Sequence, residues 1–533
     1  MEFDYVIIGA GSAGCVLANR LSANGRHAVL LLEAGPPDRN PWIHVPIGYG
    51  KLFAEPKVNW MYQSEPEPEL NGRRVFTPRG KVLGGSSSIN GLVYIRGQKE
   101  DFDEWAQLGN AGWGYEDVLP YFRKSEAFQA DANEFHGRQG PLCVSELPDR
   151  HELCDAFIDA AQSVGIARND DFNGAVQEGA GYYHVTSRNG RRSSSAVAYL
   201  RPARKRPNLK VLTEAFVTRV GFEQQGASTV MYRRGGEECV ARVRKEVLLC
   251  GGSINSPQLL QLSGIGPREL LERHGITPVL DAPGVGEGMQ DHFYARTIWK
   301  CSRPITINDA LGGLGGKMLS GLRYLFSRRG PLTVSGGYAG AFARSRAGVP
   351  RPDVQFYLIN FSTDKMGTKL HPFSAFTASM SPLRPESRGS VRIRSANPFD
   401  PPAIQYNFLS TEADRRVAVD GLKRLHELMC APAMKTYVLE RYAPAPGHLT
   451  DNDWLDYARE VGATVYHPTT TCRMGNDKLA VVDDRLRVHG VRGLRVVDAS
   501  IMPNVVSGNS NAAAIMIGEK AADLILSDAS APP

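Results

Sequence analysis

A histidine placed directly before a proline is the first side chain whose setting could serve chemistry. His467 stands in the segment YHPTTTCRMG, residues 466–475. The ring of Pro468 disfavours helical backbone at the preceding residue, so we expect His467 on an extended segment or in a loop. An ordinary pKa near 6.5 leaves much of the imidazole neutral at pH 7 and able to accept a proton. A single histidine is more often structural, so a general base is a hypothesis that needs a cofactor beside it.

The segment DYVIIGAGSAGCVLANRLSANGRHAVLLLEAG, residues 4–35, has the pattern of a dinucleotide-binding unit. In its GxGxxG spacing, Gly9 allows a tight turn, Gly11 lets the backbone approach a pyrophosphate, and Gly14 lets the following helix pack on the strand. A second apolar run ends at Glu33, whose carboxylate can bind two ribose hydroxyls and would repel a 2′-phosphate. This unit predicts dinucleotide binding, and by itself it does not separate FAD from NAD.

Four further segments contain glycine turns or a buried strand that leads into a loop and a helix. They are PRGKVLGGSSSINGLVYIRG (78–97), LLCGGSINSPQLLQLSGIGP (248–267), PGVGEGMQDH (283–292) and LRVVDASIMPNVVSGNSNAAAIMIGEKAADLIL (494–526). With these segments and the HPTTTCRMG block, the chain resembles the GMC (glucose–methanol–choline) oxidoreductases over essentially its whole length. It looks most similar to the bacterial FAD alcohol dehydrogenases that resemble choline dehydrogenase.

The resemblance implies that a primary alcohol is oxidised to an aldehyde by hydride transfer to N5 of the flavin. His467 matches the general base of the family. Its partner in the family is a second histidine or an asparagine further along the chain, and Asn511 has the expected spacing. An amide there would hydrogen-bond the substrate oxygen and leave His467 as the only base. Asn511 also precedes an apolar helical pattern, where an asparagine can act as an N-cap.

The resemblance also assigns the FAD contacts. Gly9, Gly11 and Gly14 would meet the diphosphate, Glu33 the adenosine ribose, Val217 the adenine, Gly85, Ser86 and Asn90 the flavin and ribityl region, and Asp498 and Ala499 the ribityl chain and isoalloxazine. Some family members attach FAD covalently through a histidine in the GGSSSIN block. Ile89 stands at that position, so we expect non-covalent FAD.

Two positions depart from the pattern of the family. Relatives commonly have glycine where this chain has Thr470, and proline where it has Ala513. Thr470 could narrow the space behind His467, and Ala513 could loosen the start of the C-terminal helix. Neither change removes a chemical group from the predicted site.

These residues must be positioned by an α/β fold with two parts. The resemblance implies a discontinuous Rossmann-like FAD-binding domain of residues 1–150, 205–300 and 455–533. Residues 151–204 and 301–454 would form an α+β substrate domain with an antiparallel sheet. Within it, VQFYLINF (354–361) and SVRIRS (390–395) have the partial alternation typical of strands and would suit that sheet.

Several alternatives remain open at the level of sequence. The enzyme could be a dehydrogenase that passes electrons to a quinone or another carrier, or an oxidase that uses O2 and releases H2O2. A hydroxynitrile-lyase-type reaction with structural FAD, or flavin binding without catalysis, is less favoured. Aromatic residues at 342, 356, 357, 361, 373 and 376 could line a pocket for an apolar or aryl alcohol, or could form the core of the sheet. No carboxylate or aromatic cage for the cation of choline can be placed.

Composition narrows the class further. Of 533 residues 42% are hydrophobic and the net charge is +6, as in ordinary globular proteins. The eight cysteines include no CxxC pair, which favours reduced thiols in a cytoplasmic protein over a metal site. The basic run RPARKRPNLK (201–210) lacks interleaved aromatic residues, so we expect no nucleic-acid partner.

Neither a membrane span nor a signal peptide is expected, because no apolar run is long enough and Met1 lies close to the first predicted strand. The segment KMLSGLRYLFSRRG (317–330) mixes apolar and basic residues. This segment could associate weakly with a membrane surface, which would bring the enzyme to a quinone, or it could form a solvated helix.

Overall fold

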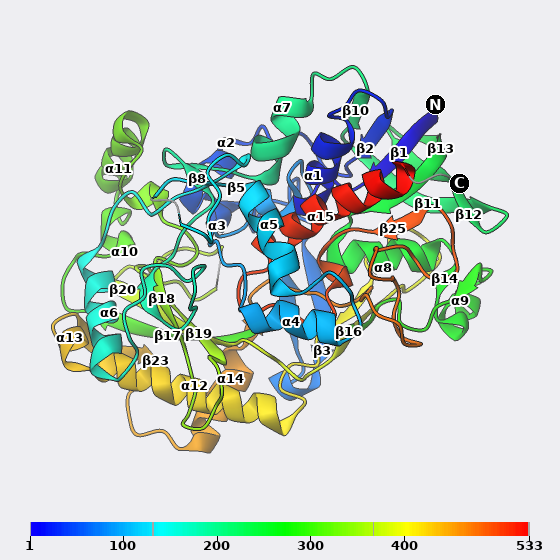
Figure 1. The fold of residues 1–533 in the computed structure, drawn as a ribbon. Helices are drawn as coiled ribbons and strands as arrows, with labels where there is room; N and C mark the ends of the chain where they lie inside the picture. The colour runs from blue at the N-terminus through cyan, green and yellow to red at the C-terminus, as the bar shows by residue number, and fades with distance from the viewer. Residues whose placement is uncertain (1, 131–132, 366, 531–533) are drawn as a thin grey trace.

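The computed structural model describes residues 2–130, 133–365 and 367–530. Figure 1 shows two regions side by side, one built from both ends of the chain and the other mainly from its middle. Each region contains a seven-stranded sheet and has its own hydrophobic core.

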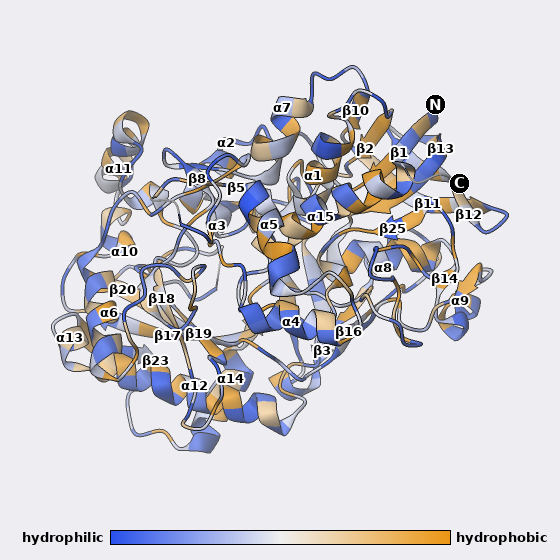
Figure 2. Ribbon diagram, viewed as in Figure 1, coloured by the Kyte–Doolittle hydropathy of each residue, from blue (hydrophilic) through white to orange (hydrophobic). Residues whose placement is uncertain are grey.

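The first sheet is the predicted dinucleotide-binding sheet. Its strand order is β10 (Leu209–Leu212), β2 (Val29–Leu32), β1 (Glu2–Ile8), β13 (Glu237–Leu249), β12 (Gly226–Arg234) and β11 (Ala215–Glu223), and β25 (Leu494–Val496) also pairs with β13. The β10–β2–β1–β13 part and β25 are parallel, whereas β12 and β11 pair in antiparallel fashion. All four residues of β2 are buried, as expected of a parallel strand covered on both faces. Figure 2 shows the resulting hydrophobic colour along β1 and β2.

Two helices from opposite ends of the chain pack together against this sheet. Helix α1 (Ser12–Leu21) follows the glycine turn, and α15 (Asn511–Ser530) is the last helix of the described chain. Arg20 donates to the two carboxylate oxygens of Glu519 at 2.8 and 2.6 Å, and the hydroxyl of Tyr199 donates to the same carboxylate at 2.9 Å. The N- and C-terminal segments therefore form one structural unit.

The second sheet is antiparallel, as predicted for the substrate region. Its order is β23 (Val438–Ala443), β17 (Phe293–Cys301), β20 (Ala375–Pro382), β19 (Val354–Ile359), β18 (Ala339–Ala343) and β7 (Gly179–Tyr182), and β24 (Ala463–Thr464) also pairs with β17. Helix α12 (Glu412–Cys430), capped by Thr411, packs on β20, and α6 (Glu152–Ser163) packs near β18 and β7. The predicted strand in 354–361 is confirmed as β19, and the α/β fold class is confirmed with it.

The other predicted strand is real but lies in a different sheet. Residues 390–395 contribute to β21 (Gly389–Arg392), which pairs with β16 (Glu287–Met289) and β22 (Ala403–Gln405) in a separate three-stranded sheet. The expectation that it joins the substrate sheet was wrong, because strand alternation does not encode the pairing partner. In addition, β17 lies almost entirely within the range 205–300 yet belongs to the antiparallel sheet. The division into two domains by residue range stays a prediction.

Candidate active site

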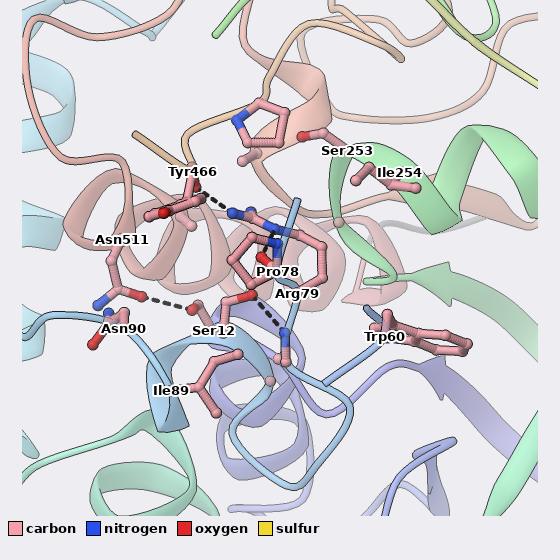
Figure 3. Close-up of a pocket in the computed structure, with 18 of the residues that line it drawn as sticks. Ser12, Trp60, Pro78, Arg79, Ile89, Asn90, Ser253, Ile254, Tyr466 and Asn511 are labelled. Carbon is pink, nitrogen blue, oxygen red and sulfur yellow. Dashed lines mark hydrogen bonds between the residues drawn. The ribbon is translucent and has the colours of Figure 1, made fainter. Parts of the chain in front are cut away.

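A large cavity lies between the two sheets and is lined by segments that are far apart in the chain. It brings together the turn after β1, the end of β2, residues 78–93 and residues 249–262, the segment around residue 467 and the start of α15. From the antiparallel sheet, β17, β19 and β20 contribute side chains. Figure 3 shows labelled residues from several of these segments pointing towards a common space.

The glycine turn at the start of α1 leaves room for a ligand only at some positions. A Cβ atom on Gly9, whose φ is +100°, would meet the carbonyl oxygen of Cys250 at 2.5 Å. A Cβ on Gly14 would meet the carbonyl oxygen of Gly9 at 2.0 Å. A Cβ on Gly11 would meet nothing closer than the carbonyl oxygen of Cys250 at 3.8 Å, and Gly11 lines the cavity with Gly9. Gly14 does not line it, so its role here is the packing of α1 on the turn.

Glu33 lies at the end of β2, where the carboxylate was expected. Its two oxygens accept hydrogen bonds from the backbone N–H groups of Ala10 and Gly35, each at 2.9 Å. Burial raises the pKa of Glu33 to about 7, although these backbone donors oppose the effect. The side chain is held rigidly against the glycine turn and lines the cavity.

The other predicted cofactor residues also line the cavity. They are Gly85, Ser86, Asn90, Val217, Asp498 and Ala499. Asp498 accepts hydrogen bonds from the N–H of Gly252 at 2.8 Å and the hydroxyl of Ser256 at 2.6 Å, which fixes it beside the second glycine turn. Ile89 is buried and lines the same space. A glycine-lined helix start with a carboxylate at the next strand end fits an adenine dinucleotide.

His467 lies on a non-helical segment held from two sides. Its backbone N–H donates to Asp291 at 2.8 Å, and the carbonyl of the preceding Tyr466 accepts from Arg79 at 2.5 Å. The second of these bonds is drawn in Figure 3. The backbone at His467, before Pro468, is non-helical, as predicted, and the imidazole is buried while still lining the cavity. The segment is therefore rigid enough to aim a base.

A second histidine fixes the proton on the His467 ring. The Nε2 of His292 lies 3.0 Å from the carbonyl oxygen of Leu383, which can only accept, so this nitrogen carries a hydrogen. The Nδ1 of neutral His292 is then an acceptor, and it lies 3.0 Å from Nδ1 of His467. This pattern assigns the hydrogen of His467 to Nδ1 and leaves Nε2 unprotonated, with a lone pair that can accept a hydrogen bond or a proton.

The surroundings keep both rings neutral. Burial lowers the pKa of His467 well below 6.5, and the neighbouring His292 and Arg79 lower it further because each disfavours a second positive charge beside it. Burial lowers the pKa of His292 to about 4, against the opposing effect of its bond to Leu383. At pH 7 the cavity therefore presents an unprotonated imidazole nitrogen.

The amide that faces this nitrogen belongs to Asn509. Its Nδ2 lies 3.2 Å from Nε2 of His467, and its Oδ1 accepts from Gln355 at 3.3 Å and from Tyr357 at 3.5 Å. Asn511 was expected in this place. Its Oδ1 instead accepts from the hydroxyl of Ser12 at 2.7 Å, as drawn in Figure 3, although Asn511 also lines the cavity.

The different positions of Asn509 and Asn511 have a simple cause. Helix α15 begins at Asn511 and turns that side chain towards the start of α1, whereas Asn509 lies in the loop before the helix. The SGNSN segment contains both asparagines, and spacing along the chain pointed to Asn511, whereas the structure places Asn509 beside His467. His292 was also missed; its segment GMQDH was noted only for its glycine turn.

The predicted aromatic positions divide between cavity and core. Tyr357 on β19 and Phe361 just after it line the cavity. Phe342, Phe356 and Phe376 are buried in the sheet, and Phe373 stacks on His371 with ring centroids 4.9 Å apart. Further aromatic rings reach the cavity from other segments, namely Tyr49, Phe53, Trp60, Phe216, Tyr294 and Tyr466.

One cation reaches the cavity from the antiparallel sheet. Arg296 on β17 lines the cavity beside Tyr294, and its guanidinium donates to the backbone carbonyls of Thr363 and Asp364. The acidic residues that line the cavity are Glu33 and Asp498, and both are among the predicted FAD contacts. Among the described residues no acidic side chain forms an ion pair with Arg296.

No cluster of three or more potential ligand side chains that could hold a metal ion occurs within residues 2–130, 133–365 and 367–530. Over the same ranges, no helix has the length and hydropathy needed to cross a membrane.

Comparison with known proteins identifies the family. Two sequence models described as GMC oxidoreductase match residues 3–294 and 385–518. An oxygen-dependent choline dehydrogenase of Vibrio vulnificus is 43% identical over 100% of this chain and 96% of its own length. An alcohol dehydrogenase [acceptor] of Pseudomonas putida is 42% identical over 98% of this chain and 96% of its own length.

Solved structures agree with the sequence relatives. A pyridoxine 4-oxidase from Mesorbium loti superposes with a TM-score of 0.89 at 29% identity, covering 98% of each chain. A formate oxidase of Aspergillus oryzae, studied for its FAD modification, has a TM-score of 0.91 at 26% identity over 99% of this chain and 98% of its own. FAD as the cofactor is thereby confirmed, while its mode of attachment stays a prediction. The motifs, the fold and the comparisons lead to one conclusion: this chain belongs to the GMC oxidoreductase family.

Proposed function

We propose that this enzyme oxidises a primary alcohol to an aldehyde and that His467 is the general base. The observation that carries the proposal is the unprotonated Nε2 of a buried, neutral imidazole, which faces the amide of Asn509 in the cavity. FAD, when bound, supplies the hydride acceptor. Because Nδ1 of His467 already carries a hydrogen, Nε2 is the atom that accepts the hydroxyl proton.

The surrounding side chains have supporting roles in this mechanism. Asn509 would hydrogen-bond the substrate oxygen through Nδ2, since Gln355 and Tyr357 hold its Oδ1 in the opposite direction. His292 is a positioning residue: it keeps the hydrogen of His467 on Nδ1 and accepts from the imidazolium that forms. Asn511 would tie the start of α15 to α1 instead of contacting the substrate.

The proposed FAD contacts follow from the cavity lining. Gly9 and Gly11 would face the diphosphate, and Glu33 the ribose. Ile89 lines the cavity where some relatives have a histidine, so no side chain there can form a histidyl–flavin bond. The flavin is expected in the supernatant after acid precipitation of the protein, and flavin retained by the pellet would contradict non-covalent binding.

The charge of the cavity favours a neutral or anionic alcohol over a cationic one. At an effective dielectric constant of ~20, a substrate cation about 6 Å from the guanidinium of Arg296 would be repelled by roughly 3 kcal/mol. Cation–π contacts with the neighbouring rings return only ~0.5–2 kcal/mol. Choline, which names several relatives, is therefore not the substrate class that this cavity fits best.

The electron acceptor is a quinone or another carrier in this proposal, and O2 with release of H2O2 is the alternative. Proteins named dehydrogenases and a protein named an oxidase are both similar to this chain. The eight cysteines are all unpaired in the structure, which supports a cytoplasmic location.

The proposal is tested by mixing the oxidised enzyme with a panel of alcohols under anaerobic conditions. We expect loss of the flavin absorbance together with formation of the aldehyde. A flavin that stays oxidised while a cyanohydrin is cleaved would instead indicate the lyase reaction. Parallel assays with O2 and with an artificial dye then separate the oxidase from the dehydrogenase.

A further inference from the structure

Helix α11 (Leu314–Ser327) carries its apolar side chains on the outside of the molecule. Leu314 and Phe326 are 87% and 88% exposed. The large hydrophobic side chains exposed on this helix are Leu314, Met318, Leu319, Leu322, Leu325 and Phe326. Figure 1 shows α11 at the edge of the molecule, standing away from both sheets. Such a concentration of exposed apolar residues on one element marks an interaction surface.

Helix α11 is amphipathic, but its apolar face points to solvent, whereas an ordinary surface helix turns its apolar face to the core. At about 100° per residue, the six apolar side chains cover an arc of roughly 140°. The buried residues of the helix, Ser320 and Tyr324, lie on the opposite side, and the Tyr324 hydroxyl donates to the carbonyl of Gly190 at 3.0 Å. The protein therefore contacts the polar side of α11 and presents its apolar side outward.

Basic side chains border this apolar arc. Lys317 and Arg323 lie on either flank, Arg329 follows the helix, and no acidic residue occurs within Leu314–Ser327. The only carboxylate that pairs with these groups among the described residues is Asp149, at 3.8 Å from Arg323 and 3.5 Å from Arg329. An apolar arc bordered by cations has the pattern of a helix that lies in a membrane interface containing anionic lipid.

The same surface lies next to the cavity. Helix α3 (Tyr49–Leu52) contributes Tyr49 to the cavity lining. The turn Pro331–Thr333 contacts both α11 and Pro46–Gly48, the turn directly before α3. The wall of the cavity formed by α3 thus faces the side of the molecule that carries α11.

We infer that α11 binds the surface of membranes that contain anionic lipids, with its apolar arc inserted among the acyl chains and its basic side chains at the headgroups. Membrane binding itself does not depend on the proposed alcohol oxidation. Its consequence does rest on that function: a bound enzyme can pass electrons to a quinone dissolved in the bilayer.

The test is co-sedimentation of the full-length, FAD-loaded enzyme with phosphatidylcholine vesicles that contain or lack phosphatidylglycerol. We expect wild type to bind the anionic vesicles and to be released by salt. Replacing three exposed residues (Met318→Ser, Leu322→Ser and Phe326→Ser) should lower the partition coefficient at least ~tenfold. Lys317→Gln combined with Arg329→Gln should remove the preference for phosphatidylglycerol.

A matched control replaces exposed leucines elsewhere, Leu108→Ser with Leu439→Ser, which are 55% and 66% exposed. This control should bind vesicles like wild type. All variants should keep wild-type turnover of a water-soluble alcohol with a dye, which shows that they fold. Absent turnover in wild type would contradict the proposed reaction and would leave the vesicle result unaffected.

Three results would overturn the inference. Wild type that stays in the supernatant with anionic vesicles excludes the surface, and a triple variant that sediments like wild type excludes α11. A wild-type dimer that the triple substitution dissociates, without vesicle binding by either protein, would identify α11 as a contact between two copies of the chain.

Discussion

At the scale of single residues, the candidate site depends on which atom each side chain presents. The imidazole of His467 can serve as a base only through the nitrogen that lacks a hydrogen. His292 decides which nitrogen that is, through contacts of 3.0 Å on both sides of its own ring. Asn509 and Asn511 are of the same type and two positions apart, yet their amides meet different partners.

The two asparagines give the first prediction. Asn509→Ala should slow reduction of the flavin by a saturating alcohol by about 10-fold or more, because a hydrogen bond to the reacting oxygen is lost. Asn511→Ala should leave this rate within a few-fold of wild type, since its partner is Ser12. Anaerobic stopped-flow absorbance measures both. The reverse order of effects would restore Asn511 as the partner of the base.

Arg296 gives the second prediction, which separates charge from shape. Choline and 3,3-dimethylbutan-1-ol have nearly the same shape and differ in charge. We expect wild type to favour the neutral alcohol in kcat/KM, and Arg296→Gln to narrow the ratio by ~10-fold or more. Thr377→Val, another cavity-lining change that leaves the charge intact, is the control. A wild-type preference for choline would show that the aromatic rings outweigh the guanidinium.

At the scale of elements, the joint between α1 and α15 holds the two ends of the chain together. Glu519 is fully buried and accepts from Arg20 and Tyr199, whereas the side chain of Arg20 is 27% exposed. Glu519→Gln should lower the free energy of unfolding by about 1–3 kcal/mol, because a charge-assisted pair is replaced by weaker bonds. The exposed pair of Lys423 and Asp451 offers the control, with Lys423→Gln costing less than ~1 kcal/mol. Equal effects in urea unfolding would contradict this ranking.

Some features of the fold could be predicted because only neighbouring residues determine them. The glycine turn, the buried β2 and the non-helical backbone before Pro468 follow from steric rules that act over a few residues. The backbone also explains why relatives commonly have glycine at position 470. Thr470 has a φ of +71°, a conformation that favours glycine. Its side chain is held by the N–H of Gln290 at 2.9 Å.

Long-range placement could not be predicted in the same way. Membership of β21 in the small sheet depends on strands near residues 288 and 404, and period-2 alternation carries no information about them. The contact of His292 with His467 joins residues 175 positions apart. The choice between Asn509 and Asn511 required knowing where α15 begins. The sequence left the role of residues 317–330 open, because an amphipathic pattern does not tell which face of a helix the rest of the protein covers.

At the scale of the whole molecule, the cavity lies where the two sheets meet, so cofactor binding and overall stability are coupled. Glu33→Gln removes a charged acceptor that is expected to bind the ribose, where such bonds contribute roughly 1.5–3 kcal/mol. We expect weaker FAD retention, a smaller rise in the unfolding temperature on adding FAD, and unchanged turnover of the fully loaded enzyme. Calorimetry with and without FAD measures this. Wild-type FAD affinity in the variant would show that Glu33 does not hold the ribose.

The central claim is that His467, neutral and free at Nε2, accepts the proton of the alcohol. The direct measurement is the anaerobic rate of flavin reduction at saturating alcohol, for wild type and His467→Ala, as a function of pH. Burial lowers the pKa of His467 well below 6.5, so the wild-type rate should be level from about pH 6.5 upward. It should fall only at lower pH, as the imidazole becomes protonated. His467→Ala should retain FAD, lose this pH step and reduce its flavin ~10²–10⁴-fold more slowly. Reduction within tenfold of wild type, with the pH step intact, would mean that another group is the base.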